Sequence, residues 1–223
     1  MCLGLGYPTL NRYDPRKLLP DSASYRTLAT AGPATVPEPF RFRVLEPYLV
    51  RPLYALAQGH VGSWDPLWFG FLVVNSLFVA STAFLLFRVG GTQFGNHSTA
   101  LVAATLYLLN FAISNAQLAG LVDASEGFFL MAVVVSLLVG RCWLLPVLGV
   151  FGALAKESFV PFSVTLAGTW WLFSKSASER ERANRLGLWI ASMAILELLT
   201  VTILQSSVTG HLVCPWSFAA GLN

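Results

Sequence analysis

The sequence predicts an all-α, polytopic membrane protein: a transmembrane bundle of about five or six spans with an external loop bearing an interfacial helix. Of its 223 residues, 55% are hydrophobic and 11% are charged, and the mean hydropathy is +0.64. Soluble domains carry about a quarter charged residues. Apolar runs separated by short polar loops make up most of the chain after residue 63. We therefore expect an external N-terminal part, residues 1–63, and a transmembrane helical domain, residues 64–223.

The N-terminal part holds no stretch long enough to cross a bilayer. Three prolines between Ala31 and Pro39 predict an extended connector. Leu49, Leu53 and Leu56 recur at helical spacing between Pro47 and Ala57, which predicts an amphipathic helix lying on the membrane surface.

The apolar runs of the second part predict the spans. Two of them are shorter than a usual span, which predicts tilted or partly re-entrant helices. The expected spans are Pro66–Phe87, Thr99–Leu121, Gly127–Gly140, Trp143–Ala155, Phe159–Phe173 and Leu186–Gln205.

Basic residues predict the orientation of these spans. The loop SKSASERERANR is the most charged in the chain, so the positive-inside rule places it in the cytoplasm. Counting back, Arg88 and Arg141 also fall on the cytoplasmic side, and residues 1–63 fall outside. Seven Lys and Arg residues of the first quarter oppose this assignment. Either the number of helices differs by one, or these residues have a local function.

Two acids of the N-terminal part are candidate catalytic residues. Asp21 stands where a helix can begin, so it is either an N-cap or a surface carboxylate acting as general base or metal ligand. Asp14 has the same two interpretations, although the Asp-Pro pair favours a turn.

Arginines follow at Arg41, Arg43 and Arg51. They contact lipid headgroups, or they form a phosphate clamp, because a guanidinium matches phosphate oxygens. If FRFR is a strand, Arg41 and Arg43 lie on one face, and Glu46 orients them.

Further charges fall on the same predicted outer side. Asp123 and Glu126 end the second expected span, where they mark its boundary or, with the polar residues before them, line a cavity. Lys156 and Glu157 form a salt-bridged turn, or the lysine contacts a headgroup or phosphate. Glu197 lies within the last expected span, and the sequence shows no partner for it.

Several classes of site are not supported. The cysteines, Cys2, Cys142 and Cys214, have neither zinc-ligand spacing nor the pattern of a disulfide framework. No nucleotide-phosphate loop, nucleophile elbow or HExxH motif is present, and nothing indicates a nucleic-acid partner.

The segments DSASYRTLA, PFRFRVLEPYLVRPL, LAGLVDASEGFFLMAVVV and GALAKESFVPF resemble bacterial integral-membrane glycosyltransferases of the GT-C superfamily. The resemblance implies a bacterial inner-membrane enzyme that takes a sugar from a polyprenyl-phosphate donor and is in contact with membrane lipid. It implies no cofactor other than a possible divalent metal, and it leaves protein partners unassigned.

The same resemblance implies roles for individual residues. Members carry an essential acid in the first external loop, which Asp21 matches best, with Asp14 in reserve. The donor phosphate would face Arg41, Arg43 and Lys156, and the acceptor or a metal would face Asp123 or Glu126.

This chain departs from the family in two ways. A full helix usually precedes the acidic loop, whereas only MCLGLGYPTL stands here, and members are usually much longer. The chain is therefore expected to be a fragment, a mis-started reading frame, or a reduced and inactive relative. The principal rival function is a non-catalytic membrane subunit or lipid-binding scaffold. A transporter lined by Asn110, Asn115, Gln117 and Glu197 is third.

Overall fold

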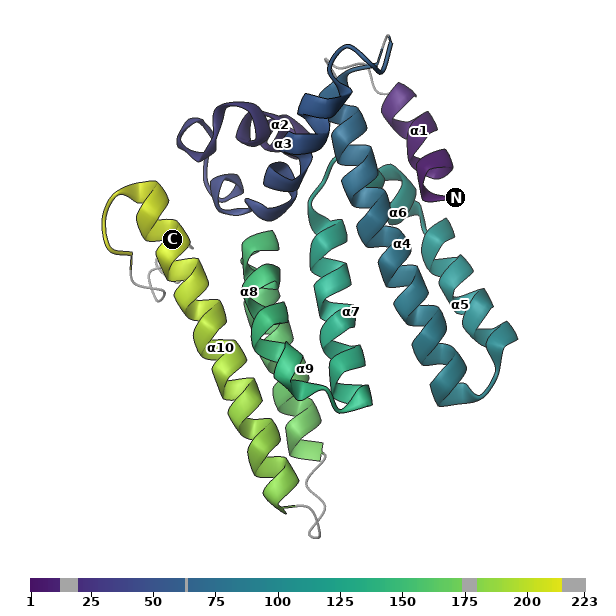
Figure 1. Cartoon of the computed structure of the whole chain (residues 1–223), viewed down its shortest axis with the longest axis vertical. Coiled ribbons are helices and arrows are strands. Elements are labelled where there is room, and N and C mark those ends of the chain that lie inside the picture. Colours follow the sequence, from purple (N-terminus) through teal and green to yellow (C-terminus); the bar gives the residue numbers. More distant parts are fainter. Residues whose placement is uncertain (13–19, 63, 174–179, 214–223) are drawn as a thin grey trace.

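The computed structural model describes residues 1–12, 20–62, 64–173 and 180–213 (Figure 1). The described residues are helical, with no strand among them, so the predicted all-α class is confirmed. The longer helices are α1 (Cys2–Arg12), α2 (Pro20–Ala31), α3 (Leu45–Ala57), α4 (Pro66–Phe94), α5 (His97–Leu109), α7 (Asp123–Val139), α8 (Leu145–Ala155), α9 (Phe159–Phe173) and α10 (Arg180–Thr209). The short elements are η1 (Pro33–Thr35), η2 (Phe40–Phe42), α6 (Phe111–Asn115), η3 (Gln117–Ala119) and η4 (Cys142–Leu144).

Three segments of the described chain are long and apolar enough to cross a membrane. They are Pro66–Phe94, His97–Ala119 and Asn184–Thr209. Two shorter apolar stretches, Cys142–Ala155 and Phe159–Phe173, lie beside them, and α7 has 17 residues. This composition is that of a membrane protein.

The first long helix, α4, ends later than predicted. Asp65 caps its start by accepting a hydrogen bond from the Leu67 amide at 2.9 Å. The helix then passes through the exposed Arg88 to Phe94. A single charge does not break a helix when its long side chain reaches the surface. The end comes at Gly95, whose φ of 63° is left-handed.

The second predicted span is interrupted. Asn110 leaves the helical conformation, and its side chain caps α6 by accepting from the Ala112 amide. The chain then turns at Gly120, which has a φ of 92° and lies against the Trp68 ring. Asp123 and Glu126 therefore begin α7 instead of ending the preceding span, which corrects the prediction. Negative charge in a first turn is favourable because it faces the positive end of the helix dipole.

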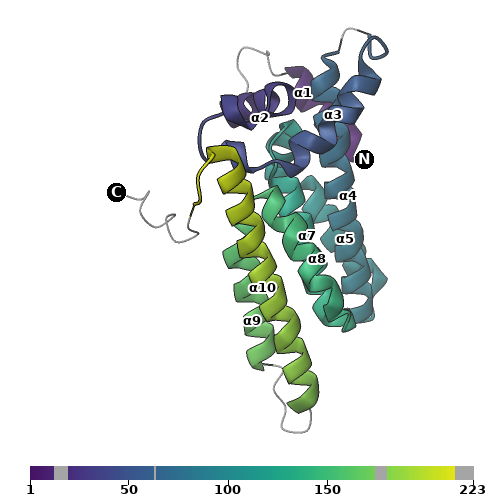
Figure 2. The ribbon, with the colours of Figure 1, turned by 60° about the vertical axis from the view of Figure 1, so that its left-hand side comes forward.

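The helices of the bundle run side by side, and residues 20–57, here the α2–α3 unit, cross one end of them (Figures 1 and 2). The start of α7 and the α8–α9 turn lie at that end. The α4–α5 and α7–α8 connections lie at the opposite end, as does the start of α10. Within the described residues, the charges that the sequence analysis assigned to the outer side thus share one end of the bundle.

Apolar contacts join the α2–α3 unit to the bundle. Tyr25 and Ala29 from α2 pack with Val50 from α3 and with Trp68 and Phe71 from α4. A second cluster joins α7, α8, α9 and α10, and a third joins α1 to α4, α6 and η3. The α2–α3 unit is therefore packed against the bundle and held in a fixed position over its end.

Candidate functional site

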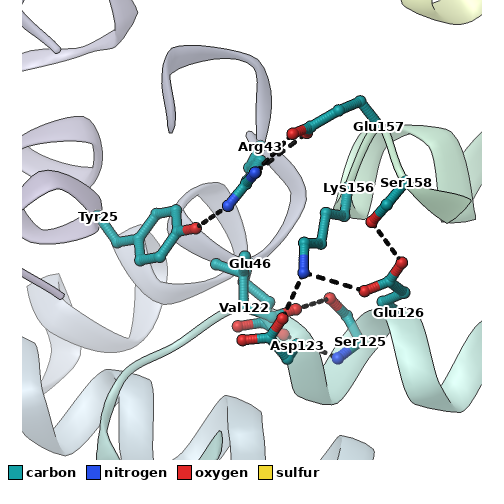
Figure 3. A network of polar contacts seen from close by, with 10 residues as sticks. All are labelled: Tyr25, Arg43, Glu46, Val122, Asp123, Ser125, Glu126, Lys156, Glu157 and Ser158. Carbon is teal, nitrogen blue, oxygen red and sulfur yellow. Dashed lines mark hydrogen bonds and ion pairs between the residues drawn. The ribbon is translucent and has the colours of Figure 1, made fainter. Parts of the chain in front are cut away.

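A polar network lies where the α2–α3 unit meets the bundle (Figure 3). It draws on α2, the residue after η2, the first turn of α7 and the α8–α9 turn, and its contacts join residues up to 114 positions apart. We use "the network" for Tyr25, Arg43, Asp123, Glu126, Lys156, Glu157 and Ser158.

Arg43 is held on three sides. Its Nε donates to Glu157 Oε2 at 3.0 Å, its Nη2 donates to Glu157 Oε1 at 2.5 Å, and its Nη1 donates to the Tyr25 hydroxyl at 2.7 Å. The guanidinium also lies over the Phe40 ring, 5.4 Å from the ring centre. Burial works against its charge, but the hydrogen bonds and charge interactions with Glu157 and Tyr25 together outweigh burial, so the pKa of Arg43 is raised. Arg43 remains a cation.

Tyr25 accepts a hydrogen bond from this cation and lies within reach of the charge of Asp21. Burial raises the pKa of the Tyr25 hydroxyl, Arg43 opposes this effect, and the charges of Asp123 and Asp21 raise it further. Asp21 stands four residues before Tyr25, so both lie on one face of α2. The exposed Asp21 is thus close enough to the network for its charge to act there.

Lys156 forms the second half of the network. Its Nζ lies 2.5 Å from Asp123 Oδ1 and 3.2 Å from Glu126 Oε2, and the Ser158 hydroxyl donates to Glu126 Oε1 at 2.6 Å. Burial opposes the charge of Lys156, but the hydrogen bonds and charges of Asp123 and Glu126 together outweigh burial, so the pKa of Lys156 is raised. Lys156 and Glu157 therefore do not pair with each other. They bind α7 and Arg43 respectively.

The network carries one net negative charge, because three carboxylates face two cations. Its cations nevertheless keep unused donors. Arg43 uses three of its five N–H groups in these bonds, and Lys156 uses two of three. A phosphate could be bound here by sharing these cations with Glu157 and Asp123.

The other two candidate arginines lie outside the network. Arg51 donates from Nε to the Ala29 carbonyl at 2.9 Å and from Nη2 to the Leu28 carbonyl at 3.1 Å, so it closes the C-terminal end of α2. Its guanidinium stacks on Tyr48 at 4.1 Å. Arg41 pairs with Glu38.

FRFR does not form the strand that would place Arg41 and Arg43 on one face. Phe40–Phe42 is a 3₁₀ turn, and Arg41 and Arg43 bind different partners. Pro37 and Pro39 precede the turn, and each lacks the N–H that a strand ladder requires. A single clamp made from the three arginines is therefore not present.

The two candidate acids have different outcomes. Asp21 lies in the first turn of α2, one residue beyond the helix start at Pro20, so it is not the N-cap. Asp14 lies outside the described residues. Sequence reasoning missed Tyr25, which the helical period from Asp21 could have found, and Ser158, which directly follows Lys156 and Glu157.

Glu46 binds α7 and not the arginines that it was expected to orient. Its side chain is fully buried, and Oε1 accepts from the Ser125 amide at 2.9 Å. Burial raises the pKa of Glu46 to about 8, against the opposing effect of the Ser125 hydrogen bonds and with a small addition from Asp123. Glu46 is therefore mostly neutral at pH 7.

Glu197, which had no visible partner, is fully buried and accepts a hydrogen bond from Ser163 Oγ of α9 at 2.8 Å. Asn110, a candidate for a transport path, is used as the cap of α6. Asn115 binds the Phe111 carbonyl and Ser114.

A divalent metal does not fit the network as it stands. Within the described residues, no three His, Cys, Asp or Glu side chains converge on one point. Asp123 and Glu126 are both turned to Lys156.

Comparisons of the chain with protein-family models, with characterised proteins and with solved structures give no match.

Proposed function

We propose that the chain is a membrane glycosyltransferase of the GT-C type, which moves a sugar from a polyprenyl-phosphate donor to an external or lipid acceptor. One observation carries the proposal: two cations with unused donors lie together at one end of the membrane helices, and the exposed acid Asp21 lies on the same face of α2 as Tyr25, which binds Arg43. The resemblance of the surrounding segments to GT-C enzymes supports it.

In this proposal α7, α8 and α9 also enter the bilayer, which gives the five or six spans expected from the sequence. The α2–α3 unit lies on the outer surface of the bacterial inner membrane, with α3 in the interface. Exposed Tyr48, Leu49 and Leu56 give α3 the apolar surface that such a position requires.

The depth of the network suits a lipid phosphate. The network joins the first turn of α7 to the α8–α9 turn, so it lies at an end of the apolar helices that the α2–α3 unit covers (Figure 1). A lipid whose tail lies in the bilayer places its phosphate at this level. Arg43 and Lys156 then supply charge-assisted hydrogen bonds to it.

The proposed reaction uses Asp21 and the two cations. Asp21 accepts the proton of the acceptor hydroxyl as that oxygen bonds to the anomeric carbon of the sugar. The bond from the anomeric carbon to the phosphate oxygen breaks, and its electron pair stays on that oxygen. Arg43 and Lys156 stabilise the lipid phosphate that leaves.

The non-catalytic scaffold is the second candidate, and the full pairing of the network favours it. Each cation already has a carboxylate partner, so the network on its own could serve to fasten the α2–α3 unit to the bundle. The positions of the arginines point the other way. A scaffold was expected to leave its arginines on lipid headgroups, whereas Arg43 and Arg51 bind protein groups.

Transfer from a labelled polyprenyl-phosphate sugar separates the two candidates. Membranes carrying the wild-type chain are compared with Asp21→Asn and with Glu38→Gln, an exposed acid of the same unit that pairs with Arg41. We expect activity in the wild type and the control, and a loss of at least about 100-fold in Asp21→Asn. Equal activity in all three, or none in the wild type, would overturn the proposal.

A further inference from the structure

The buried acid Glu46 occupies a place where an apolar side chain would be expected. It is fully buried on α3, and its Oε2 has no partner among the described residues. A buried polar group costs free energy unless it forms hydrogen bonds. The hydrogen bond that its Oε1 accepts from the Ser125 amide joins two helices through residues 79 positions apart.

This bond completes the start of α7. The first four amides of a helix have no partner within it, and the N-cap residue, Val122, supplies no side-chain acceptor. Ser125 is the third residue of α7, the position whose amide a capping side chain usually binds. Glu46 therefore performs from α3 the function of a missing local cap.

Ser125 lies between the two acids that hold Lys156. Asp123 is two residues before it and Glu126 directly follows it. Both acids are in the same helical turn as Ser125. A fixed Ser125 amide therefore also fixes the backbone positions from which the two carboxylate side chains extend. Through them it fixes Lys156 at 2.5 Å from Asp123 and 3.2 Å from Glu126.

The same helix holds the end of α2. Five residues after Glu46, Arg51 binds the last carbonyls of α2, at Leu28 and Ala29. The two positions are about 7.5 Å apart along the helix axis. A guanidinium thus meets the negative end of α2, which is the favourable sign, and the carboxyl oxygen of Glu46 accepts a hydrogen bond from an amide at the start of α7.

We propose that Glu46 and Arg51 are positioning residues: from one helix, α3, they fix the first turn of α7 and the end of α2, and so set the Lys156 site against Asp21. Their effect on transfer rests on the proposed function, but the effect of Glu46 on Lys156 does not. Neither residue touches the substrate in this mechanism.

The variants for the test are Glu46→Leu, Glu46→Gln and Arg51→Met. Glu46→Leu removes the acceptor, whereas Glu46→Gln keeps a carbonyl oxygen for the Ser125 amide and is close in shape to the neutral acid. Arg51→Met keeps a long side chain but removes the bonds to α2. If Glu46→Leu does not fold, Ser125→Pro removes the same bond from the other side, since proline is tolerated in a first turn.

The first readout is the rate at which an amine-reactive ester labels Lys156 in the purified protein, measured by mass spectrometry with Lys17 and Lys175 as internal references. Only the neutral amine reacts, so the carboxylates that raise the pKa of Lys156 slow its labelling. We expect Glu46→Leu to label about threefold faster, which corresponds to a pKa lower by half a unit. Glu46→Gln and Arg51→Met should match the wild type.

The second readout is sugar transfer by the same variants. We expect it to fall about tenfold in Glu46→Leu and in Arg51→Met, with kcat changed more than KM, and to be retained in Glu46→Gln. Wild-type labelling in Glu46→Leu, or Glu46→Gln as impaired as Glu46→Leu, would overturn the inference. A wild type without transfer but with the expected labelling would refute the proposed function and leave the positioning of Lys156 supported.

Discussion

Replacing Glu157 by Gln separates a phosphate-binding network from one that only joins two parts of the fold. The two carboxylate oxygens of Glu157 lie 2.5 Å from Arg43 Nη2 and 3.0 Å from Arg43 Nε. Glu157→Gln removes the negative charge opposite Arg43 and replaces one of these two acceptor oxygens by an amide nitrogen. The Arg43 and Glu157 side chains are 13% and 19% exposed. Exposed ion pairs contribute up to about 1 kcal/mol, and breaking a buried pair costs about 3–5 kcal/mol.

The intermediate exposure of this pair places the loss of stability at about 2 kcal/mol, which lowers Tm by about 4–8 °C for a chain of this size. Tryptophan fluorescence during heating in detergent measures it. The matched control is Glu38→Gln, because Glu38 is 61% exposed and its loss should change stability by less than about 0.5 kcal/mol.

Donor binding gives the second half of this prediction. A donor phosphate must share Arg43 with Glu157, so removing the competing carboxylate should tighten binding of polyprenyl phosphate by up to about tenfold. The variant would then be less stable but bind the lipid better. Reduced stability with unchanged lipid binding would show that the phosphate does not meet Arg43, and an unchanged Tm would show that the pair does not stabilise the fold.

Three further predictions concern stability. Burial raises the pKa of Glu46 from its ordinary value of 4.5 to about 8, so the unfolded chain releases this proton at lower pH than the folded chain does. The free energy of unfolding of the wild type should therefore fall by up to about 5 kcal/mol as pH rises from about 5 to 8. Glu46→Gln should remove this fall, measured as the slope of Tm against pH. Gly152→Ala should destabilise the protein by about 1–3 kcal/mol, because its Cβ would lie 2.3–2.5 Å from the Phe159 ring, whereas Gly168→Ala meets nothing within 4 Å and should not lower Tm. Arg51→Met should cost about 1–2 kcal/mol by freeing two carbonyls at the end of α2, measured by chemical unfolding.

The helical class could be predicted because it follows from composition and from the length of apolar runs. Helix ends were less predictable, because they depend on backbone conformation and not on charge. Arg88 was expected to end a helix that continues to Phe94, where Gly95 ends it with a positive φ. Asp123 was assigned to the end of one helix and begins another, since a carboxylate is compatible with either side of a loop until the position of the turn at Gly120 is known.

The candidate site could be predicted as a set of residues but not as a set of pairs. The positive-inside rule put Lys156, Glu157 and Asp123 on the same side as the N-terminal part. Their partners depend on how the α2–α3 unit crosses the bundle, which no local pattern encodes. Arg43 and Glu157 are 114 residues apart, and neighbouring Lys156 and Glu157 turn to different elements.

The central claim is that the network binds a lipid phosphate, and native mass spectrometry of the purified protein tests it most directly. Polyprenyl phosphate and phosphatidylglycerol are offered to the wild type, Lys156→Met, Arg43→Gln and the control Arg41→Gln, whose side chain pairs with Glu38. We predict that the wild type and the control prefer the polyprenyl phosphate, and that the two network variants bind it at least about tenfold more weakly. Equal binding of both lipids, unchanged in all variants, would contradict the account and leave the network as a structural junction.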